Sequence, residues 1–255
     1  MNNIWAVCKR EIKTYFTSPI AYVAITVFLI VTGFFFYTLI QWFNMQSMQM
    51  ARNPQYFQQL NINQMVFAPL FHNISIILLF LVPILTMRLF AEEKKSKTEE
   101  LLFTSPISIS QIILGKYLAS LFVLLVMLLL NGLLSLFVFA FGNPEFMPLL
   151  IGYLGLFLMG ASFMALGIFF SSLTENQIVA AALGFGFFLL FFVLNWASQF
   201  AGGIWRSVLN YLSFFQHFDD LTRGILDTTD IVYYLSFMFF GLFLTYSVIQ
   251  SRRWR

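Results

Sequence analysis

Charge is scarce in this sequence: only 10% of its 255 residues are Asp, Glu, Lys or Arg, whereas 60% are hydrophobic and 19% aromatic. A soluble domain carries about a quarter charged residues, so this composition cannot cover a water-facing surface. A bilayer tolerates it, provided that the backbone satisfies its own hydrogen bonds in helices or in a closed barrel. The apolar runs are continuous rather than alternating, which excludes a barrel and predicts membrane-spanning helices.

Residues that usually carry chemistry are equally few. The single cysteine, Cys8, cannot form an internal disulfide. The two histidines, His72 and His217, lack the H-E-x-x-H spacing of a zinc protease, and no G-x-x-x-x-G-K-[ST] phosphate loop occurs. We therefore expect no catalytic, metal-binding or cofactor-binding residue here, and we expect the chain not to be an enzyme. The uncharged interiors of the apolar runs also disfavour an ion-coupled carrier, which normally buries ionisable groups.

Six apolar runs are each about the 20 residues needed to cross the hydrocarbon core. They cover residues 20–43, 65–89, 117–141, 149–170, 178–200 and 231–250. The predicted fold is an all-α polytopic membrane protein whose transmembrane domain spans residues 20–250. Polar or mixed segments connect the runs at 44–64, 88–116 and 201–230, and a basic tail follows at 251–255.

Residues 1–19 precede the first run and have a different pattern. Apolar side chains recur at helical spacing, and the cations Lys9, Arg10 and Lys13 lie between them. Trp5 is of the type found at headgroup level. This pattern predicts an amphipathic helix in the membrane interface, ended by Ser18-Pro19.

Orientation follows from the distribution of Lys and Arg. With both termini in the cytoplasm, inside segments hold eleven of the fourteen Lys and Arg residues. The outside segments then keep Arg52, Arg206 and Arg223. We therefore predict a multi-pass protein with both termini cytoplasmic.

The densest charge lies between the second and third runs, in residues 88–116. A helix there would place Glu93 four residues before Lys97, and Lys95 four before Glu99. Such pairs stabilise a helix by only about 0.2–0.5 kcal/mol each. Two interpretations stay open, a solvated charged loop and a docking helix that presents charge to a cytoplasmic partner.

Several segments carry a family resemblance. They read MRLFAEEKK (87–95), TEELL (98–102), TSPIS (104–108), LGKY (114–117), SLTENQ (172–177) and SRRW (251–254), with a further match over 217–234. In order and spacing they resemble ABC-2 type exporter permeases, and most closely the gliding-motility-associated permease group. Lys97 departs from the pattern, since the family usually has glycine before the threonine.

The resemblance implies a type V exporter-like architecture with a cytoplasmic coupling helix at residues 92–103. Its candidate contacts with the ATPase are Glu92, Glu93, Lys94, Lys95, Thr98, Glu99, Glu100, Leu101 and Leu102. It also implies that residues 201–230 re-enter the outer leaflet, with His217, Asp219, Asp220 and Arg223 as the outer polar residues. For Asp219 or Asp220 with Arg223, a structural ion pair is favoured over a substrate site.

The implied partners are an ABC ATP-binding subunit holding ATP and Mg²⁺, a second permease half that is identical or related, and the lipid bilayer, with no nucleic acid. An accessory membrane protein with an outer domain stays open. The leading hypothesis is a permease of an ATP-driven exporter in a bacterial inner membrane, with its substrate unassigned. The alternative is a non-transporting scaffold that anchors a cytoplasmic or envelope machine.

Overall fold

The structure, a computed structural model, describes residues 2–52, 61–98, 107–141, 144–200 and 202–253, and no strand occurs within these ranges. Within them, six helical segments are long and apolar enough to cross a membrane. They are α2 (Pro19–Arg52), η1 (Asn63–Phe67) with α3 (Ala68–Thr86) and α4 (Arg88–Lys95), α6 (Ile109–Phe141), α7 (Phe146–Leu173), α8 (Gln177–Phe200) and α11 (Thr228–Arg253). This confirms the predicted all-helical class with six candidate spans.

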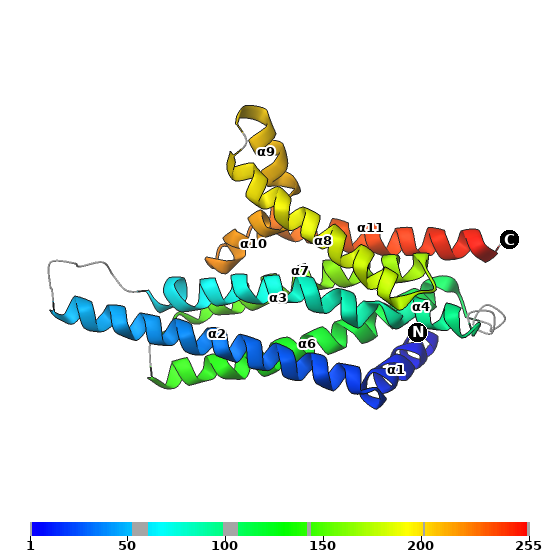
Figure 1. The fold of residues 1–255 in the computed structure, drawn as a ribbon, viewed down its shortest axis with the longest axis horizontal. Helices are drawn as coiled ribbons and strands as arrows, with labels where there is room; N and C mark the ends of the chain where they lie inside the picture. The colour runs from blue at the N-terminus through cyan, green and yellow to red at the C-terminus, as the bar shows by residue number, and fades with distance from the viewer. Residues whose placement is uncertain (1, 53–60, 99–106, 142–143, 201, 254–255) are drawn as a thin grey trace.

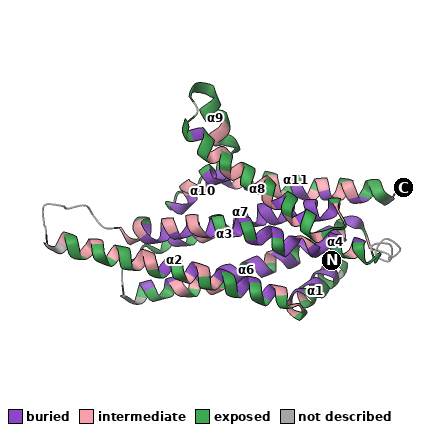
Figure 2. Cartoon of the chain, in the orientation of Figure 1, coloured by how far each residue is buried: buried purple, intermediate pink, exposed green. Residues whose placement is uncertain are grey.

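The spanning helices form a bundle around α3 and α7. In the most apolar stretches of these two spans 72% and 67% of the residues are buried, against 22%, 17% and 22% for α2, α8 and α11. Figure 2 shows the same contrast, with buried residues concentrated along α3 and α7. The helices around this centre keep apolar faces open, as expected of a protein whose solvent is lipid.

Two short helices lie at the end of the bundle where both chain termini are found (Figure 1). Helix α1 (Asn2–Thr17) meets α2 at a corner, and Pro19 is the first residue of α2. Proline is favoured there because its fixed φ suits the first turn and its missing N–H is not needed. Helix α4 (Arg88–Lys95) follows α3 after a single residue, Met87. We call this the terminal end of the bundle.

The segment after α8 turns back toward the bundle. Helix α9 (Gly203–Leu212) has no buried residue, whereas α10 (Phe214–Thr222) packs against α7. The hydroxyl of Ser213 accepts a hydrogen bond from the Gln216 amide at 3.3 Å and caps α10. In Figure 1, α9 stands away from the bundle and α10 lies against it.

One local expectation was wrong. Residues 44–52, expected in a polar loop, continue α2 to Arg52. The basic tail predicted at 251–255 begins within α11, which runs to Arg253. The residues here include Gln, Met and Arg, which are good helix formers, so a helix does not have to stop where apolarity stops.

Polar side chains link α2, α6 and α7 within the bundle. The Asn131 amide donates to Thr32 Oγ1 at 2.9 Å, and the Tyr153 hydroxyl donates to Asn131 Oδ1 at 2.9 Å. The Asn131 side chain therefore joins α6 to both α2 and α7. A polar group in an apolar interior needs such a partner, since leaving it unsatisfied is costly.

Candidate functional site: a buried ion cluster behind helix α4

The junction between α3 and α4 is held by the end of α7. The Ser171 hydroxyl donates to the Met87 carbonyl at 2.7 Å and accepts from the amides of Phe90 and Ala91 at 3.0 and 3.2 Å. The N–H groups at the start of a helix have no partner within it, so this hydroxyl supplies one. The Lys94 ammonium donates to the Ser172 carbonyl. Helix α4 is therefore fixed to α7 at both of its ends.

Four charged side chains form one cluster between α1, α4 and α6. Lys116 Nζ lies 3.1 Å from Glu11 Oε1, 2.9 Å from Glu93 Oε1 and 2.7 Å from the Leu89 carbonyl oxygen. Arg10 Nη2 lies 2.8 Å from Glu11 Oε1 and 2.9 Å from Glu93 Oε1. We call Arg10, Glu11, Glu93 and Lys116 the ion cluster.

The ion cluster is balanced in charge, and three of its four side chains are removed from water. Lys116 is 1% exposed, and the side chains of Glu11 and Glu93 are 9% and 15% exposed. Burial alone would raise the pKa of the Glu11 carboxyl, but Lys116 and Arg10 together outweigh it and lower that pKa below its ordinary value. Burial also opposes ionisation of Arg10, yet Glu11 and Glu93 raise its pKa. The cluster thus holds its charges by pairing two cations with two carboxylates.

Helix α1 docks on α6 closely enough to make this cluster possible. A Cβ atom on Gly115 would lie 2.7 Å from Val7 Cβ, so only glycine permits the approach. The Tyr15 hydroxyl donates to the Leu85 carbonyl at 2.8 Å, and the Arg88 guanidinium lies 4.6 Å from the centre of the Tyr15 ring. Burial raises the pKa of the Tyr15 phenol, which stays protonated and keeps donating.

Residues 5–250 match the family model described as ABC-2 family transporter protein. This chain belongs to the ABC-2 transporter family. It is therefore the membrane component of an ABC transporter, and the family implies an ABC ATP-binding partner. A search of curated proteins gave no match.

Three of the segments that carry the family resemblance meet in space. Glu93 and Lys94 come from the 87–95 segment, Gly115 and Lys116 from 114–117, and Ser172 from 172–177. All of them lie at the terminal end of the permease, where they hold α1, α4, α6 and α7 together.

The residues expected to contact the ATPase divide into two groups in the permease. Glu92, Lys95 and Thr98 are exposed, whereas Glu93 and Lys94 point into the bundle and are engaged there. Glu99, Glu100, Leu101 and Leu102 lie outside the described residues. The expected Glu93–Lys97 helical pair does not form, because α4 ends at Lys95 and Glu93 turns to α1 and α6.

The end of α4 has the hydrogen bonds of a Schellman motif. The Thr98 amide donates to the Glu93 carbonyl and the Lys97 amide to the Lys94 carbonyl, both at 3.0 Å. Lys97 has φ 55°, the left-handed conformation that glycine adopts most easily. The departure from glycine noted in the sequence thus falls on the one position of this turn where glycine is favoured.

Helix α1 exposes the residues that the sequence assigned to the membrane interface. Trp5 is 66% exposed, and Lys9, Arg10 and Lys13 are also on exposed positions. Its inward face carries Val7, Cys8, Glu11 and Tyr15.

A second polar cluster lies toward the opposite end of the permease, between α10 and α11. His217 Nδ1 is 2.7 Å from Asp230 Oδ1, and its Nε2 is 3.1 Å from the Tyr211 carbonyl oxygen. The ring of Tyr233 stacks on that of His217 with centroids 4.0 Å apart. A carbonyl can only accept, so Nε2 carries a hydrogen and a further proton lies between Nδ1 and the Asp230 carboxyl.

The other residues that the resemblance assigned to an outer segment form a series of contacts from α3 to α10. Arg223 Nη2 lies 2.6 Å from Asp219 Oδ2, and His72 Nε2 lies 3.2 Å from Asp219 Oδ1. Asp219 is thus the partner of Arg223, and Asp220 is not joined to it by an ion pair in the described part of the chain. This geometry agrees with a structural bridge.

Three residues of the two polar clusters were given no role in the sequence analysis. Glu11, Lys116 and Asp230 received no role, although Lys116 stands alone between apolar residues. Glu11 follows Cys8 by three residues and precedes Tyr15 by four, which places a carboxylate on the apolar face of α1. That placement was a signal that α1 packs against a cation.

Proposed function

We propose that this permease is the membrane subunit of an ATP-driven exporter and that a separate ATP-binding subunit, with its ATP and Mg²⁺, contacts α4 and the residues after it. The observation that supports this is the ion cluster. Because Glu93 is bonded to Arg10 of α1 and to Lys116 of α6, a displacement of α4 carries both helices with it. A force applied at the surface of α4 would therefore be transmitted to α1 and to the membrane span α6.

The exposed side of α4 offers the contact. Glu92, Lys95 and Thr98 face away from the bundle, and Glu99, Glu100, Leu101 and Leu102 follow them in the sequence. Glu93 and Lys94, on the side of α4 that faces the bundle, then position α4 without contacting the ATPase themselves. Lys9 and Lys13 of α1, together with Trp5, are proposed to rest on lipid headgroups.

The test is assembly and ATP hydrolysis by the purified complex. Replacing the exposed residues with Glu92→Ala, Lys95→Ala and Thr98→Ala together should reduce co-purification of the ATP-binding subunit or coupled hydrolysis by at least about tenfold. Arg206→Ala, on an exposed position of α9 remote from α4, is the matched control and should change neither. Unaltered assembly and hydrolysis in the triple variant would place the ATPase contact elsewhere.

A membrane scaffold is the second candidate, because the same cluster would also make α4 a rigid anchor for a partner. A scaffold should bind the partner without moving when ATP is added. Spin labels at exposed Lys95 and exposed Lys9 separate the two functions: an exporter predicts an ATP-dependent change in label distances relative to α8, and a scaffold predicts none.

We further propose a bacterial inner membrane as the location, with both termini in the cytoplasm. The eleven Lys and Arg residues assigned to the inside support this orientation. A fluorescent-protein fusion at the C-terminus should be bright and an alkaline phosphatase fusion there inactive. The reverse pair of results would invert the topology and remove α4 from the reach of a cytoplasmic ATPase.

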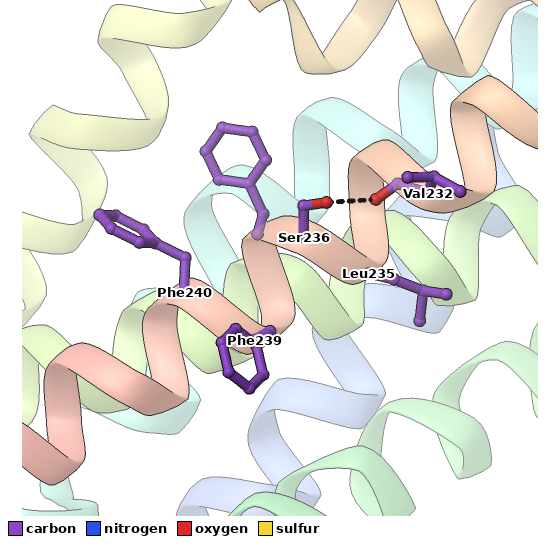
Figure 3. A pocket seen from close by; sticks show the side chains of 6 residues that line it. Val232, Leu235, Ser236, Phe239 and Phe240 are labelled. Carbon is purple, nitrogen blue, oxygen red and sulfur yellow. Dashed lines mark hydrogen bonds between the residues drawn. The ribbon is translucent and has the colours of Figure 1, made fainter.

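The proposed assembly contains a second permease half, identical or related, with room for an accessory membrane protein. The apolar faces of α2, α8 and α11 support such contacts. On α11 a cavity of about 640 Å³ is lined by Val232, Leu235, Phe239 and Phe240, and the Ser236 hydroxyl bonds back to the Val232 carbonyl at 2.7 Å (Figure 3). With its hydroxyl satisfied within α11, this face suits lipid or an apolar helix.

Two finer proposals rest on the sequence. The gliding-motility-associated group is proposed as the branch of the family to which the chain is closest. Residues 201–230 are proposed to re-enter the outer leaflet, and contact of α10 with α7 supports this. His217 and Asp219 then hold the re-entrant segment through Asp230 and His72.

A further inference from the structure

A cavity of about 290 Å³ lies between α3, α8 and α10, away from the ion cluster and the α4 surface. Its wall is rich in polar side chains, unlike the apolar face of α11. Helix α8 contributes Asn195 and Gln199, α10 contributes Gln216 and Asp219, and α3 contributes His72.

The polar groups on α8 are concentrated at this cavity. Phe192, Asn195 and Gln199 are spaced i, i+3 and i+7, so they share one face of the helix. Residues 178–194 are all apolar or glycine, and Asn195 is the first polar side chain after Gln177. Beyond Gln177, the first residue of α8, amide side chains therefore occur on this helix only where it lines the cavity.

Three side-chain amides line the cavity. Within the described part of the chain, those of Asn195, Gln199 and Gln216 make no hydrogen bond to another protein group, and Gln199 and Gln216 lie at exposed positions. Each amide offers two donor hydrogens and an acceptor oxygen, so this small space is lined by donors and acceptors together. A ligand that can both donate and accept hydrogen bonds would match it.

The charges at the cavity already neutralise one another. Asp219 Oδ2 is 2.6 Å from Arg223 Nη2, and its Oδ1 is 3.2 Å from His72 Nε2. A cationic ligand would have to displace Arg223 from this carboxylate, and an anionic ligand would meet that carboxylate directly. The groups that remain free favour a neutral ligand.

Aromatic rings complete the wall. Phe192 of α8 and Phe215 of α10 meet edge to face with centroids 5.1 Å apart. Rings beside amides suit a ligand that has C–H faces and a rim of hydroxyl groups, since each hydroxyl both donates and accepts. The volume is at the lower end of the roughly 300–1,000 Å³ of ligand pockets, which limits the ligand to about one ring.

We propose that this cavity binds a neutral, hydroxyl-rich group of the size of one sugar ring. Such a group could come from the headgroup of a glycolipid or from a free sugar. Binding here does not require ATP-driven export, so its test stands apart from the ATPase assays above.

The experiment uses the full chain, purified without sugar-headed detergents and placed in nanodiscs of phosphatidylcholine with monoglucosyl diacylglycerol. Native mass spectrometry counts the retained glycolipid, and saturation-transfer NMR measures binding of free glucose. We expect the wild type to retain one of these probes. Asn195→Leu with Gln216→Leu should weaken that binding at least about tenfold, the loss expected when hydrogen bonds to the ligand are removed. Gln41→Leu, exposed on α2, should leave it unchanged.

Glycolipid retention without glucose binding identifies a lipid headgroup, and glucose binding identifies a free sugar; both support the proposal. Failure of the wild type to retain either probe would overturn it, as would equal retention by the double variant. Gln199→Leu alone, at an exposed position, covers the case in which the double variant does not fold, and it should also weaken binding.

Discussion

Charged side chains are buried toward both ends of the bundle, but they are neutralised in different ways. In the ion cluster two cations and two carboxylates come from α1, α4 and α6, and their ion pairs join residues up to 105 positions apart. Between α10 and α11 a single carboxylate, Asp230, meets His217 only 13 positions away. The first arrangement joins distant helices, and the second fixes a local turn of the chain.

The two ends of the bundle differ in how far they can transmit a motion. A cluster that spans three helices makes them respond together, which suits the end where a partner ATPase is proposed to act. A local pair holds one segment against its neighbour and leaves the rest of the bundle unaffected. Substitutions at the two ends should therefore differ in how much they destabilise the protein and in how many helices they affect.

The largest effect is expected for Lys116→Met. It leaves Glu11 and Glu93 buried with Arg10 as the one remaining cation of the ion cluster, and breaking a buried pair in this way costs about 3–5 kcal/mol. Unfolding in an SDS titration measures the loss. Lys9→Met, on the exposed surface of α1, is the control and should stay within about 0.5 kcal/mol of wild type.

A double variant sharpens this prediction. Adding Glu93→Gln to Lys116→Met removes one of the uncompensated carboxylates, so part of the lost stability should return. If the double variant is as unstable as the sum of the two single variants, the two residues are not coupled and the ion cluster does not act as a unit.

A smaller and more local effect is expected for Asp230→Leu. It leaves His217 Nδ1 buried without its partner, at a cost of about 1–3 kcal/mol. Hydrogen exchange should rise in α9 and α10 and stay unchanged in α1 and α4. Asp230→Asn keeps an acceptor oxygen and should be milder; a uniform rise along the chain would show that the pair is not local.

Acid should weaken the ion cluster through Glu11. Its pKa is lowered in the folded protein, so its stabilising contribution is present above the unfolded value of about 4.3 and is lost as the pH falls through the folded value. The stability difference between wild type and Glu11→Gln should thus be largest at neutral pH and shrink as the solution is made acidic. A difference that does not change with pH would contradict the ionised state of Glu11.

The smallest effect, and the only gain, is expected for Lys97→Gly. Relief of the left-handed conformation, worth roughly 1–2 kcal/mol, is partly offset by the greater freedom of glycine in the unfolded chain, about 0.5–1 kcal/mol. The net gain in unfolding free energy should be below about 1.5 kcal/mol. Lys95→Gly, inside α4, is the control and should destabilise.

Much of the fold was predictable because membrane spans are governed by length and apolarity. All six candidate spans and the amphipathic α1 were expected, with errors at their ends. Hydropathy predicts which residues lie in the membrane, but it does not predict where a helix ends. The extension of α2 to Arg52 was therefore missed.

The ion cluster was harder to predict because it depends on which helices become neighbours. The family motifs included Glu93 and Lys116, but the spacing of these residues in the sequence does not predict that they contact each other. Glu11 lies among the cations Lys9, Arg10 and Lys13, so the sequence analysis treated this segment as basic and gave the carboxylate no role. Contacts between residues 83 and 105 positions apart are set by packing, and Gly115 is the local sign that a helix would approach there.

The order of synthesis gives the ion cluster one more consequence. Glu11 leaves the ribosome 105 residues before Lys116, so during that interval it has no ammonium of α6 to join. Until α6 is made, the Glu11 carboxylate lacks its Lys116 partner. If α1 rests on lipid headgroups through its cations and Trp5, as proposed above, it would stay at the membrane surface during this interval. Closure of the cluster then marks the moment at which the first helix of the chain and the third span are in place together.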